Sequence, residues 1–416
     1  MRYKYYNLSL GYTGKHSQIG TLNSQFYGLL FQNNLDVSDD MMLFVQRVPK
    51  QDFFRELCEL ETSHFDIQHT QHIKQIIQKF KLSLTNLDKN PSSKNVRRYI
   101  NWANVLLRHG CFDELISHYP NSTSVEVAWL KETAIFELAL SRNQPLTIKN
   151  QLLLIEDCIN RATDREKILL LTQIIVNHYR HSKESCYQTK INDYCDQLLE
   201  CLEKYDADDF HSILHCSVGY RGIAFADKFN DSTRSLFLKK AETLARSLRP
   251  TNNIEHIIAQ ENLFNCLQTV AKWNISQNEI NNAESNLLEL IQIDPYDSTG
   301  FSECGFFYLS NESYEKAANY FQQALQLGPP GTGMNAYYYA KCLEQLGQTQ
   351  KAFDCLHQST QLDKYAVSPW LDLIDLYIDR NDSAQAKQIA THLFNEPILH
   401  EQLENEEKNY ILCLIN

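Results

Sequence analysis

Residues 298–331 read STGFSECGFFYLSNESYEKAANYFQQALQLGPPG. In the second half of this stretch, apolar residues recur three and four positions apart: Ala317, Phe321, Ala324 and Leu325. Such spacing places the side chains on one face of an α-helix. Gly328 is a typical helix stop, and the two prolines that follow it prevent the helix from continuing. We therefore predict an amphipathic helix that ends at this glycine.

The whole stretch resembles a tetratricopeptide repeat, a helix–turn–helix unit of about 34 residues. The residues that carry the resemblance are, in chain order, Phe301, Cys304, Gly305, Tyr308, Tyr314, Ala317, Phe321, Ala324 and Pro329. The resemblance implies that Gly305 and Ala317 are small because the two helices of the unit cross closely there. The large side chains of Phe301, Tyr308 and Phe321 are then expected to fill the space beside the crossing.

The pattern recurs on both sides of this unit. The alanines at the equivalent position are Ala283, Ala317, Ala352 and Ala386, and the spacings between them are 34, 35 and 34 residues. The departures from the family pattern are Ser359, Leu393 and Ile398, all in the last two units. We predict four helix pairs over residues 264–400 and a capping helix over residues 401–416, because terminal units need a polar outer face.

Residues 95–263 contain amphipathic runs without a regular repeat, such as VEVAWLKETAIFELAL and REKILLLTQIIVNHY. Their spacing of roughly 35 to 45 residues per pair is typical of α-solenoids. We interpret them as degenerate helical hairpins that continue the repeats. A separate helical bundle is the alternative.

Residues 1–94 are harder to classify. The stretches KYYNLSLGYTG and MMLFVQRVP resemble strands, whereas DFFRELCELE looks helical and TQHIKQIIQKFKLSLTNL is an amphipathic helix. The stretch DKNPSSKN at residues 88–95 is typical of a linker. The expected fold is therefore an all-α superhelix, similar to tetratricopeptide solenoids, with a small N-terminal segment that is helical or mixed α/β.

The composition argues against several classes of function. The chain has 416 residues and a formal net charge of -12, so we expect no nucleic-acid partner, since non-specific binding needs a basic surface. No apolar run approaches the about 20 residues of a membrane span, and the first residues lack the apolar core of a signal peptide. The 12 cysteines show no paired C-x-x-C spacing. They indicate free thiols, several of them buried, in a reducing cytoplasm.

Residues 328–335, GPPGTGMN, raise the question of a nucleotide site, because the first six match a phosphate loop. That loop continues with a lysine for the phosphates and a hydroxyl for Mg²⁺, where this chain has Met334 and Asn335. It should also follow a buried strand, not the predicted helix. We therefore expect a helix-ending turn and no nucleotide.

Several histidines are paired at helical spacing: His69 with His72, His178 with His181, and His211 with His215. Such pairs can share a metal, but none carries the H-E-x-x-H signature, and the spacing supplies no third ligand. The stretch LDVSDD at residues 35–40 lacks EF-hand spacing and is typical of a helix cap. We expect neither a metal nor a cofactor. No G-x-S-x-G motif indicates a catalytic serine.

The resemblance implies that the first helix of each unit lines a concave binding face. In our phasing this face carries Gln268, Lys272, Ser302, Phe306, Tyr337, Lys341, Leu371 and Asp375. Some members of the family hold a carboxylate with Lys and Asn on these helices. Lys272 and Lys341 would suit such a clamp, but its Asn partners are missing.

Three carboxylates, Asp372, Asp375 and Asp379, have the spacing of one helix face. Residues 367–416 hold 9 acidic and 3 basic residues, which would favour a basic peptide, with Tyr337 and Tyr338 supplying apolar or cation–π contact. A merely solvated helix face is the alternative. The candidate binding residues are thus Lys272, Phe306, Tyr337, Lys341, Asp372, Asp375 and Asp379.

These observations favour a scaffold that binds a protein or peptide on a concave helical-repeat face. The alternative is an enzyme whose N-terminal and middle regions form the active site while the repeats recruit a protein substrate. A third class, a regulatory sensor, would change shape when peptide binds. The sequence leans towards a non-catalytic role and does not identify the partner.

Overall fold

The computed structural model describes the backbone of residues 65–416, except 109–111, 121–124, 142–145, 161, 206–207, 252, 296, 328–331 and 364–365. Side chains are described from Ile77 on, at most of these positions. The strand-like stretches expected before residue 62 and the LDVSDD stretch lie outside the described residues. No helix in the described ranges is long and apolar enough to cross a bilayer.

Every regular element in these ranges is a helix. In chain order they are α4 (Phe65–Lys89), α5 (Ser93–Arg108), α6 (Phe112–Ser117), α7 (Val125–Ser141), α8 (Lys149–Cys158), α9 (Asp164–Asn177), the π-helix η2 (His178–Ser182), the 3₁₀ helix η3 (Ser185–Tyr187), α10 (Gln188–Lys204), α11 (Phe210–Ile223), α12 (Asp231–Ser247), α13 (Asn253–Ser276), α14 (Ile280–Ile293), α15 (Ser298–Ser310), α16 (Tyr314–Leu327), α17 (Thr332–Gln345), α18 (Thr349–Leu362), α19 (Val367–Asp379), α20 (Ser383–Asn395), α21 (Pro397–Gln402) and α22 (Asn405–Ile415).

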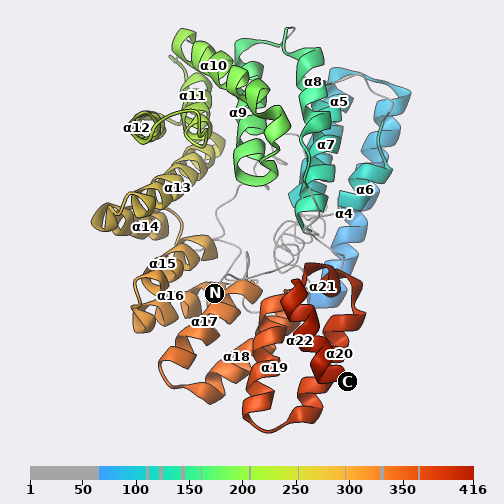
Figure 1. Cartoon of the computed structure of the whole chain (residues 1–416). Helices are drawn as coiled ribbons and strands as arrows, with labels where there is room; N and C mark the ends of the chain where they lie inside the picture. Colours follow the sequence, from blue (N-terminus) through green and yellow to red (C-terminus); the bar gives the residue numbers. More distant parts are fainter. Residues whose placement is uncertain are drawn as a thin grey trace.

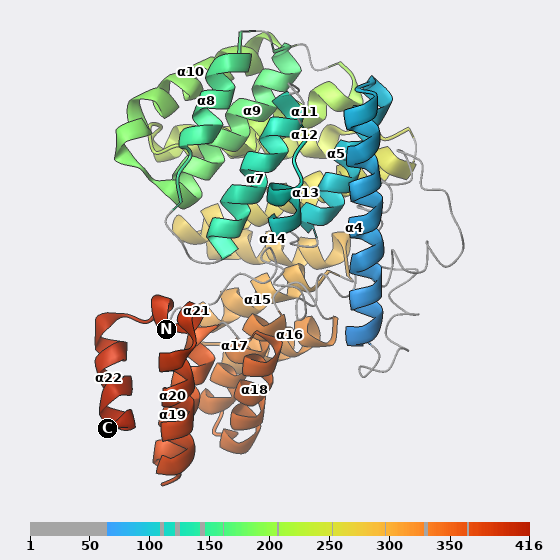
Figure 2. The same cartoon turned by 90° about the vertical axis from the view of Figure 1, so that its right-hand side faces the viewer.

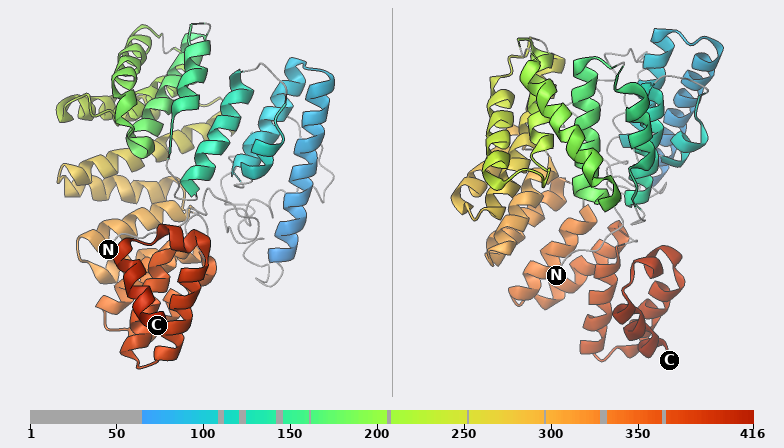
Figure 3. Two further views of the ribbon diagram at one scale, coloured as in Figure 1. Left: turned by 45° about the vertical axis from the view of Figure 1, so that its right-hand side comes forward. Right: turned by 45° about the horizontal axis from the view of Figure 1, so that its top comes forward.

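The helices form one curved array, and each packs mainly against its neighbours in the chain. In Figure 1 the array runs from α4 and α5 through α8–α12 and α13–α16 to α17–α22. The two views of Figure 3 show the same succession without a break between the middle helices and the repeats. The all-α superhelix predicted from the sequence is confirmed, and the middle region continues the array.

The repeats are the helix pairs α13–α14, α15–α16, α17–α18 and α19–α20. The four alanines that set the spacing are all buried: Ala283, Ala317, Ala352 and Ala386. Gly305 of α15 lies against the ring of Phe321 on α16, where a Cβ would be 2.7 Å from Cε1. The close crossing at Gly305 is therefore present, and an aromatic ring fills it.

The middle helices share a separate core with Cys266 and Val270 of α13. α9 begins with a capping box, in which Thr163 and Glu166 satisfy each other's backbone amides. α11 crosses α9 closely at two glycines, because a Cβ on Gly219 or Gly222 would collide with side chains of the neighbouring helices. Gly-based contacts thus recur outside the regular repeats.

Residues 88–95 are not a linker, contrary to our expectation. α4 and α5 are joined by a short turn and pack on each other (Figure 2), with Phe80 and Leu87 in one core with Tyr99. The Asn95 side chain fixes the turn, since its Nδ2 donates to the carbonyl oxygens of Asn86 and Asn90 at 3.2 and 2.8 Å. The polar residues that suggested a linker therefore belong to a tight turn, which Asn95 stabilises by hydrogen bonds.

The GPPGTGMN stretch contributes to packing between helices. α16 ends at Leu327, as predicted, but α17 already begins at Thr332, so Met334 and Asn335 are helical. A Cβ on Gly333 would lie 2.5 Å from Cβ of Asp363. The carbonyl of Gly333 accepts a hydrogen bond from Ser359 Oγ at 2.8 Å. The third glycine of the stretch, Gly333, is therefore explained by close contact with the end of α18. Residues 328–331 lie outside the described ranges.

The C-terminal helix α22 packs on α20 and closes the array (Figure 2). Leu403 and Ile411 are buried, whereas Tyr410 and Leu412 are each 37% exposed.

Candidate functional site

A chain of polar contacts joins the first helices of successive repeats. We call it the polar ladder; its members are Gln268, Lys272, Ser302, Glu303, Asn335, Tyr337, Lys341, Glu344, Asp372, Asp375 and Tyr410. Its cross-helix partners lie between 31 and 35 residues apart in the chain. This separation is close to one repeat, because the first three contacts link equivalent helices of neighbouring units, and the fourth links the last repeat to the capping helix. Most of our candidate binding residues belong to it.

The first step of the ladder joins α13 to α15. Glu303 Oε1 accepts from Gln268 Nε2 at 2.7 Å and lies 2.6 Å from Lys272 Nζ. The side chain of Lys272 is 51% exposed, whereas that of Glu303 is 16% exposed. Lys272 therefore keeps part of its surface accessible while its charge is neutralised by its own chain.

The second step joins α15 to α17 and is buried. Ser302 Oγ donates to Asn335 Oδ1 at 2.8 Å, and neither side chain is exposed to solvent. Beside this bond, the ring of Phe306 makes an edge contact with Tyr338, with centroids 4.8 Å apart. It makes a second edge contact with Phe321 at 5.1 Å. Phe306 is partly buried among these rings, so it presents only part of its surface.

The third step joins α17 to α19 and corrects our assignment of three residues, Tyr337, Lys341 and Asp372. Lys341 Nζ lies 3.1 Å from Asp372 Oδ2 and 2.5 Å from Glu344 Oε2. Tyr337 is fully buried and hydrogen-bonded to Asp372, so its ring is not available for the contact we expected. Asp372 is only 9% exposed. The acidic face is therefore not entirely free, because its first carboxylate is used between the repeats.

The pKa shifts of Lys341 and Tyr337 agree with their contacts to Asp372. Burial alone would lower the pKa of Lys341, but Asp372 and Glu344 together raise it. Burial, and next the Asp372 charge, raise the pKa of Tyr337. The lysine thus stays charged and the phenol stays protonated, as an ion pair with an added hydrogen bond requires.

The fourth step joins α19 to the C-terminal helix. Tyr410 Oη donates to Asp375 Oδ1 at 2.6 Å, and both residues are exposed. Burial of the Tyr410 hydroxyl raises its pKa, and the nearby charges of Asp375 and Asp379 add to this effect. Asp375 and Asp379 thus lie on the same side of α19, as their spacing predicts, and both remain accessible.

The ladder does not resemble a carboxylate clamp. Lys272 faces Glu303, and Lys341 faces both Glu344 and Asp372. A clamp needs cations whose charge is not already satisfied by the protein. The lysines that the sequence offered for a clamp are instead used between repeats.

The two described histidine pairs make different contacts. The rings of His211 and His215 lie parallel, with centroids 6.3 Å apart, while His178 Nε2 is 3.1 Å from Gln188 Oε1. Burial, helped by Arg165 and His211, lowers the pKa of His215 to about 4. Within the described part of the chain, no group of three His, Cys, Asp or Glu is placed to hold a metal. The side chains of His69 and His72 lie outside the described residues.

One open pocket of about 440 Å³ lies between α11 and α12, away from the ladder. It is lined by Tyr220, Leu236, Lys239, Lys240, Thr243 and Leu244. The Lys240 ammonium lies 4.9 Å from the centre of the Tyr220 ring. This surface is mainly apolar with a basic edge, and our reading of the sequence did not identify it.

Sequence reasoning also missed the partners that complete the ladder, namely Glu303, Asn335, Glu344 and Tyr410. A usable signal was present, since opposite charges recur about one repeat apart, as in Lys272 with Glu303 and Lys341 with Asp372. Tyr410 had no such signal, because it lies in the capping helix, outside the repeat pattern.

No known family model matches the chain, and no curated protein is significantly similar to it. Among solved structures, a signal transduction ATPase of the STAND class with a tetratricopeptide repeat sensor, from Pyrococcus horikoshii, is 12% identical. That match covers 92% of this chain and 67% of the other, with a TM-score of 0.46. MamA is 14% identical over 42% of this chain and 91% of its own, with a TM-score of 0.30.

PilF of Pseudomonas aeruginosa is 16% identical, and the match covers 57% of this chain and 97% of PilF, with a TM-score of 0.36. These likenesses are distant. The tetratricopeptide-like arrangement predicted from the sequence is confirmed by the helix pairs themselves and their 34- and 35-residue spacing.

Proposed function

We propose that the chain is a scaffold that binds a protein or peptide along the first helices of its repeats. The observation that carries this proposal is the polar ladder. It holds the first helices of all four repeats and the capping helix in a fixed order. An extended and pre-organised surface is what a helical-repeat binder offers, because less conformational entropy is lost when the partner binds.

The accessible part of this surface favours a basic partner. Asp375 and Asp379 remain exposed beside Tyr410, and residues 367–416 have 9 acidic against 3 basic residues. Complementary charge steers association and selects partners. The corrected candidate surface therefore consists of Lys272, Phe306, Tyr338, Asp375, Asp379 and Tyr410, with Tyr337, Lys341 and Asp372 supporting it from within.

The proposed location is the cytoplasm, where thiols stay reduced. The ten cysteines within the described ranges form no disulfide with one another, and six of the ten are buried. The enzyme alternative places the active site in the N-terminal and middle regions together, and the structure does not describe the side chains of residues 1–76. It therefore stays a prediction, as does the absence of a nucleic-acid partner.

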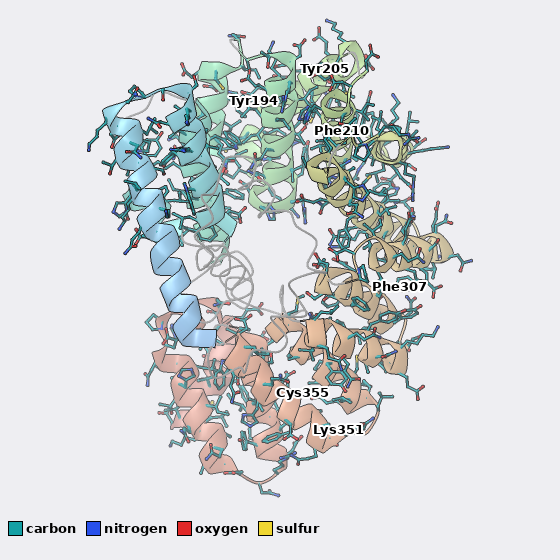
Figure 4. All side chains as sticks on the ribbon, turned by 180° about the vertical axis from the view of Figure 1, so that it is seen from behind. Tyr194, Tyr205, Phe210, Phe307, Lys351 and Cys355 are labelled. Carbon is teal, nitrogen blue, oxygen red and sulfur yellow. The ribbon has the colours of Figure 1, made fainter. Side chains whose placement is uncertain are left out.

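Site-specific photo-crosslinking tests the scaffold proposal. A benzoylphenylalanine replaces Lys272 or Asp379 on first helices, or Lys351 on the second helix α18 as the control (Figure 4). Crosslinking is performed in the native host. We expect specific adducts at positions 272 and 379 and none above background at 351. Adducts at 351 alone, or at none of the three positions, would contradict binding along the first helices.

A further inference from the structure

The crossing of α9 and α11 brings two arginines together in the middle region. The two helices lie side by side (Figures 1 and 3). A Cβ on Gly222 of α11 would lie 3.5 Å from Cγ2 of Val176, close to the end of α9. Just beyond these positions, the guanidinium carbon of Arg180 in η2 lies 5.2 Å from the centre of the ring of Phe225, which follows the end of α11. The crossing therefore fixes η2, which continues α9, against the end of α11.

Arg221 precedes Gly222 and lies beside this contact. Its Nη1 is buried and has no hydrogen-bond partner within the described part of the chain. Burial is the largest influence on the pKa of Arg221 and lowers it; Arg180 lowers it further, whereas Cys266 and Glu261 on α13 act in the opposite direction. A guanidinium keeps its proton in proteins. The charge and the unused donor therefore both persist.

Other basic side chains nearby form ion pairs with carboxylates. Lys228 Nζ lies 2.5 Å from Asp196 Oδ1, and Arg234 Nη1 lies 3.7 Å from Asp231 Oδ1. By contrast, no ion pair joins Arg180 or Arg221 to a carboxylate among the described residues, although Glu261 is near enough to act on Arg221. Arg221 lies four residues before Phe225, whose ring Arg180 contacts, so the two arginines share one region of the fold and neither has an ion pair with a described carboxylate.

We propose that Arg180 and Arg221 form a binding site for an oxyanion, either a carboxylate or a phosphate group. A buried donor without a partner costs free energy, and adjacent like charges repel. An oxyanion between the two groups relieves both penalties. The guanidinium fork fits such oxygens in a bidentate geometry, and the ring of Phe225 packs against the guanidinium of Arg180. This site does not rest on the proposed scaffold function, because none of its residues belongs to the repeats.

Isothermal titration calorimetry on the full chain tests the site. Sodium phosphate and sodium acetate are titrated separately, at constant ionic strength, into wild type, Arg221→Met, Arg180→Gln and Arg249→Gln. Arg249 is the control because the same positive charge is removed from a side chain that only contacts backbone carbonyls of Arg246 and Leu248. The two titrations distinguish a phosphate group from a carboxylate.

We expect the wild type and Arg249→Gln to bind at least one of the anions. Each site variant should lose at least about tenfold in affinity, the effect of one charged hydrogen bond. Arg221→Met should also melt at an equal or higher temperature without ligand, since it removes a buried charge that has no partner. Arg180→Gln affects an exposed side chain and is expected to fold. No heat from either anion in wild type, or equal affinities in all four proteins, would overturn the proposal.

Discussion

The carboxylate of Asp372 on α19 lies 3.1 Å from the ammonium of Lys341 on α17, and only 11% of the Asp372 side chain is exposed. Two residues predicted to contact a ligand therefore contact each other across neighbouring repeats. Tyr337 binds the same carboxylate from a fully buried position. The stability of the repeat array is thus expected to depend on this cluster.

Removing the Asp372 carboxylate should destabilise the array. Asp372→Ala leaves Lys341 with Glu344 alone and leaves the buried Tyr337 hydroxyl without its acceptor, at a cost of about 2–4 kcal/mol. The matched control is Asp379→Ala on the same helix, which removes an exposed carboxylate and should change stability by less than about 0.5 kcal/mol. Urea unfolding followed by circular dichroism measures both. Equal midpoints for the two variants would show that the cluster contributes no stability.

The crossing at Gly305 predicts a steric effect with an internal control. A Cβ at Gly305 would be 2.7 Å from Phe321, whereas one at Gly300 of the same helix would be 3.4 Å from its nearest neighbour. Gly305→Ala should therefore destabilise by about 1–3 kcal/mol through overpacking. Gly300→Ala should be neutral or stabilising by up to about 1 kcal/mol through helix propensity. Thermal unfolding of the two variants should separate them; the opposite order would show that the crossing is wrongly placed.

The spacing of small and large residues was enough to predict these helix pairs, because close packing restricts which residue types fit at a crossing. Ala283, Ala317, Ala352 and Ala386 are all buried at the positions that their 34- and 35-residue spacing indicated. The prediction of a linker at residues 88–95 was wrong for a physical reason. Polar and Pro-containing stretches also form tight turns, and tertiary contacts such as that between Phe80 and Tyr99 distinguish a turn from a linker.

The binding face was harder to predict than the fold. Helical spacing correctly placed Asp372, Asp375 and Asp379 on one side of α19, but it could not show that Lys341 and Tyr337 would occupy the first carboxylate. Whether a side chain on one helix is exposed depends on how the neighbouring helix is shifted along it. The periodicity of apolar residues within one helix does not give that shift. The same limit explains why Arg180 and Arg221, on different helices, were not identified.

Acid should destabilise the folded chain through His215. Burial, then Arg165 and His211, hold the pKa of this imidazole at about 4 in the fold, against about 6.5 in the unfolded chain. The unfolded state therefore binds the proton first, so the contribution is complete above about pH 6.5 and is lost as the pH falls towards about 4.

The loss at pH 5 relative to pH 7 should be about 2 kcal/mol. His215→Gln should remove this part of the pH dependence, whereas His256→Gln, at an exposed position, should retain it. Unfolding free energies at the two pH values measure the difference. Identical pH dependence in wild type and His215→Gln would show that His215 is not buried as a neutral ring.

Thiol reactivity should follow burial in the native chain. Burial raises the pKa of Cys195, Cys304 and Cys342 to about 12, while Cys186 and Cys413 are exposed. Iodoacetamide at pH 8 should therefore modify the exposed pair at least about a hundredfold faster, because the thiolate is the reactive form. Peptide mass spectrometry measures the rates, and unfolding in guanidinium should make them equal. Rapid native labelling of Cys304 would contradict the packing of α15.

The central claim is that the accessible carboxylates of Asp375 and Asp379, at the C-terminal end of the polar ladder, bind a protein partner. Capture from native host extract, quantified by mass spectrometry at low ionic strength, tests this most directly. The variant is Asp375→Asn with Asp379→Asn, which keeps the size of both side chains and the hydrogen-bonding capacity at Tyr410. The control is Glu315→Gln with Asp354→Asn, which removes two exposed carboxylates from second helices.

We predict that the first double variant recovers severalfold less of a specific partner than wild type and control do at low ionic strength. The difference should shrink near about 0.5 M salt, because screening already weakens the contact there. Equal recovery by wild type and both double variants at low ionic strength would contradict the claim.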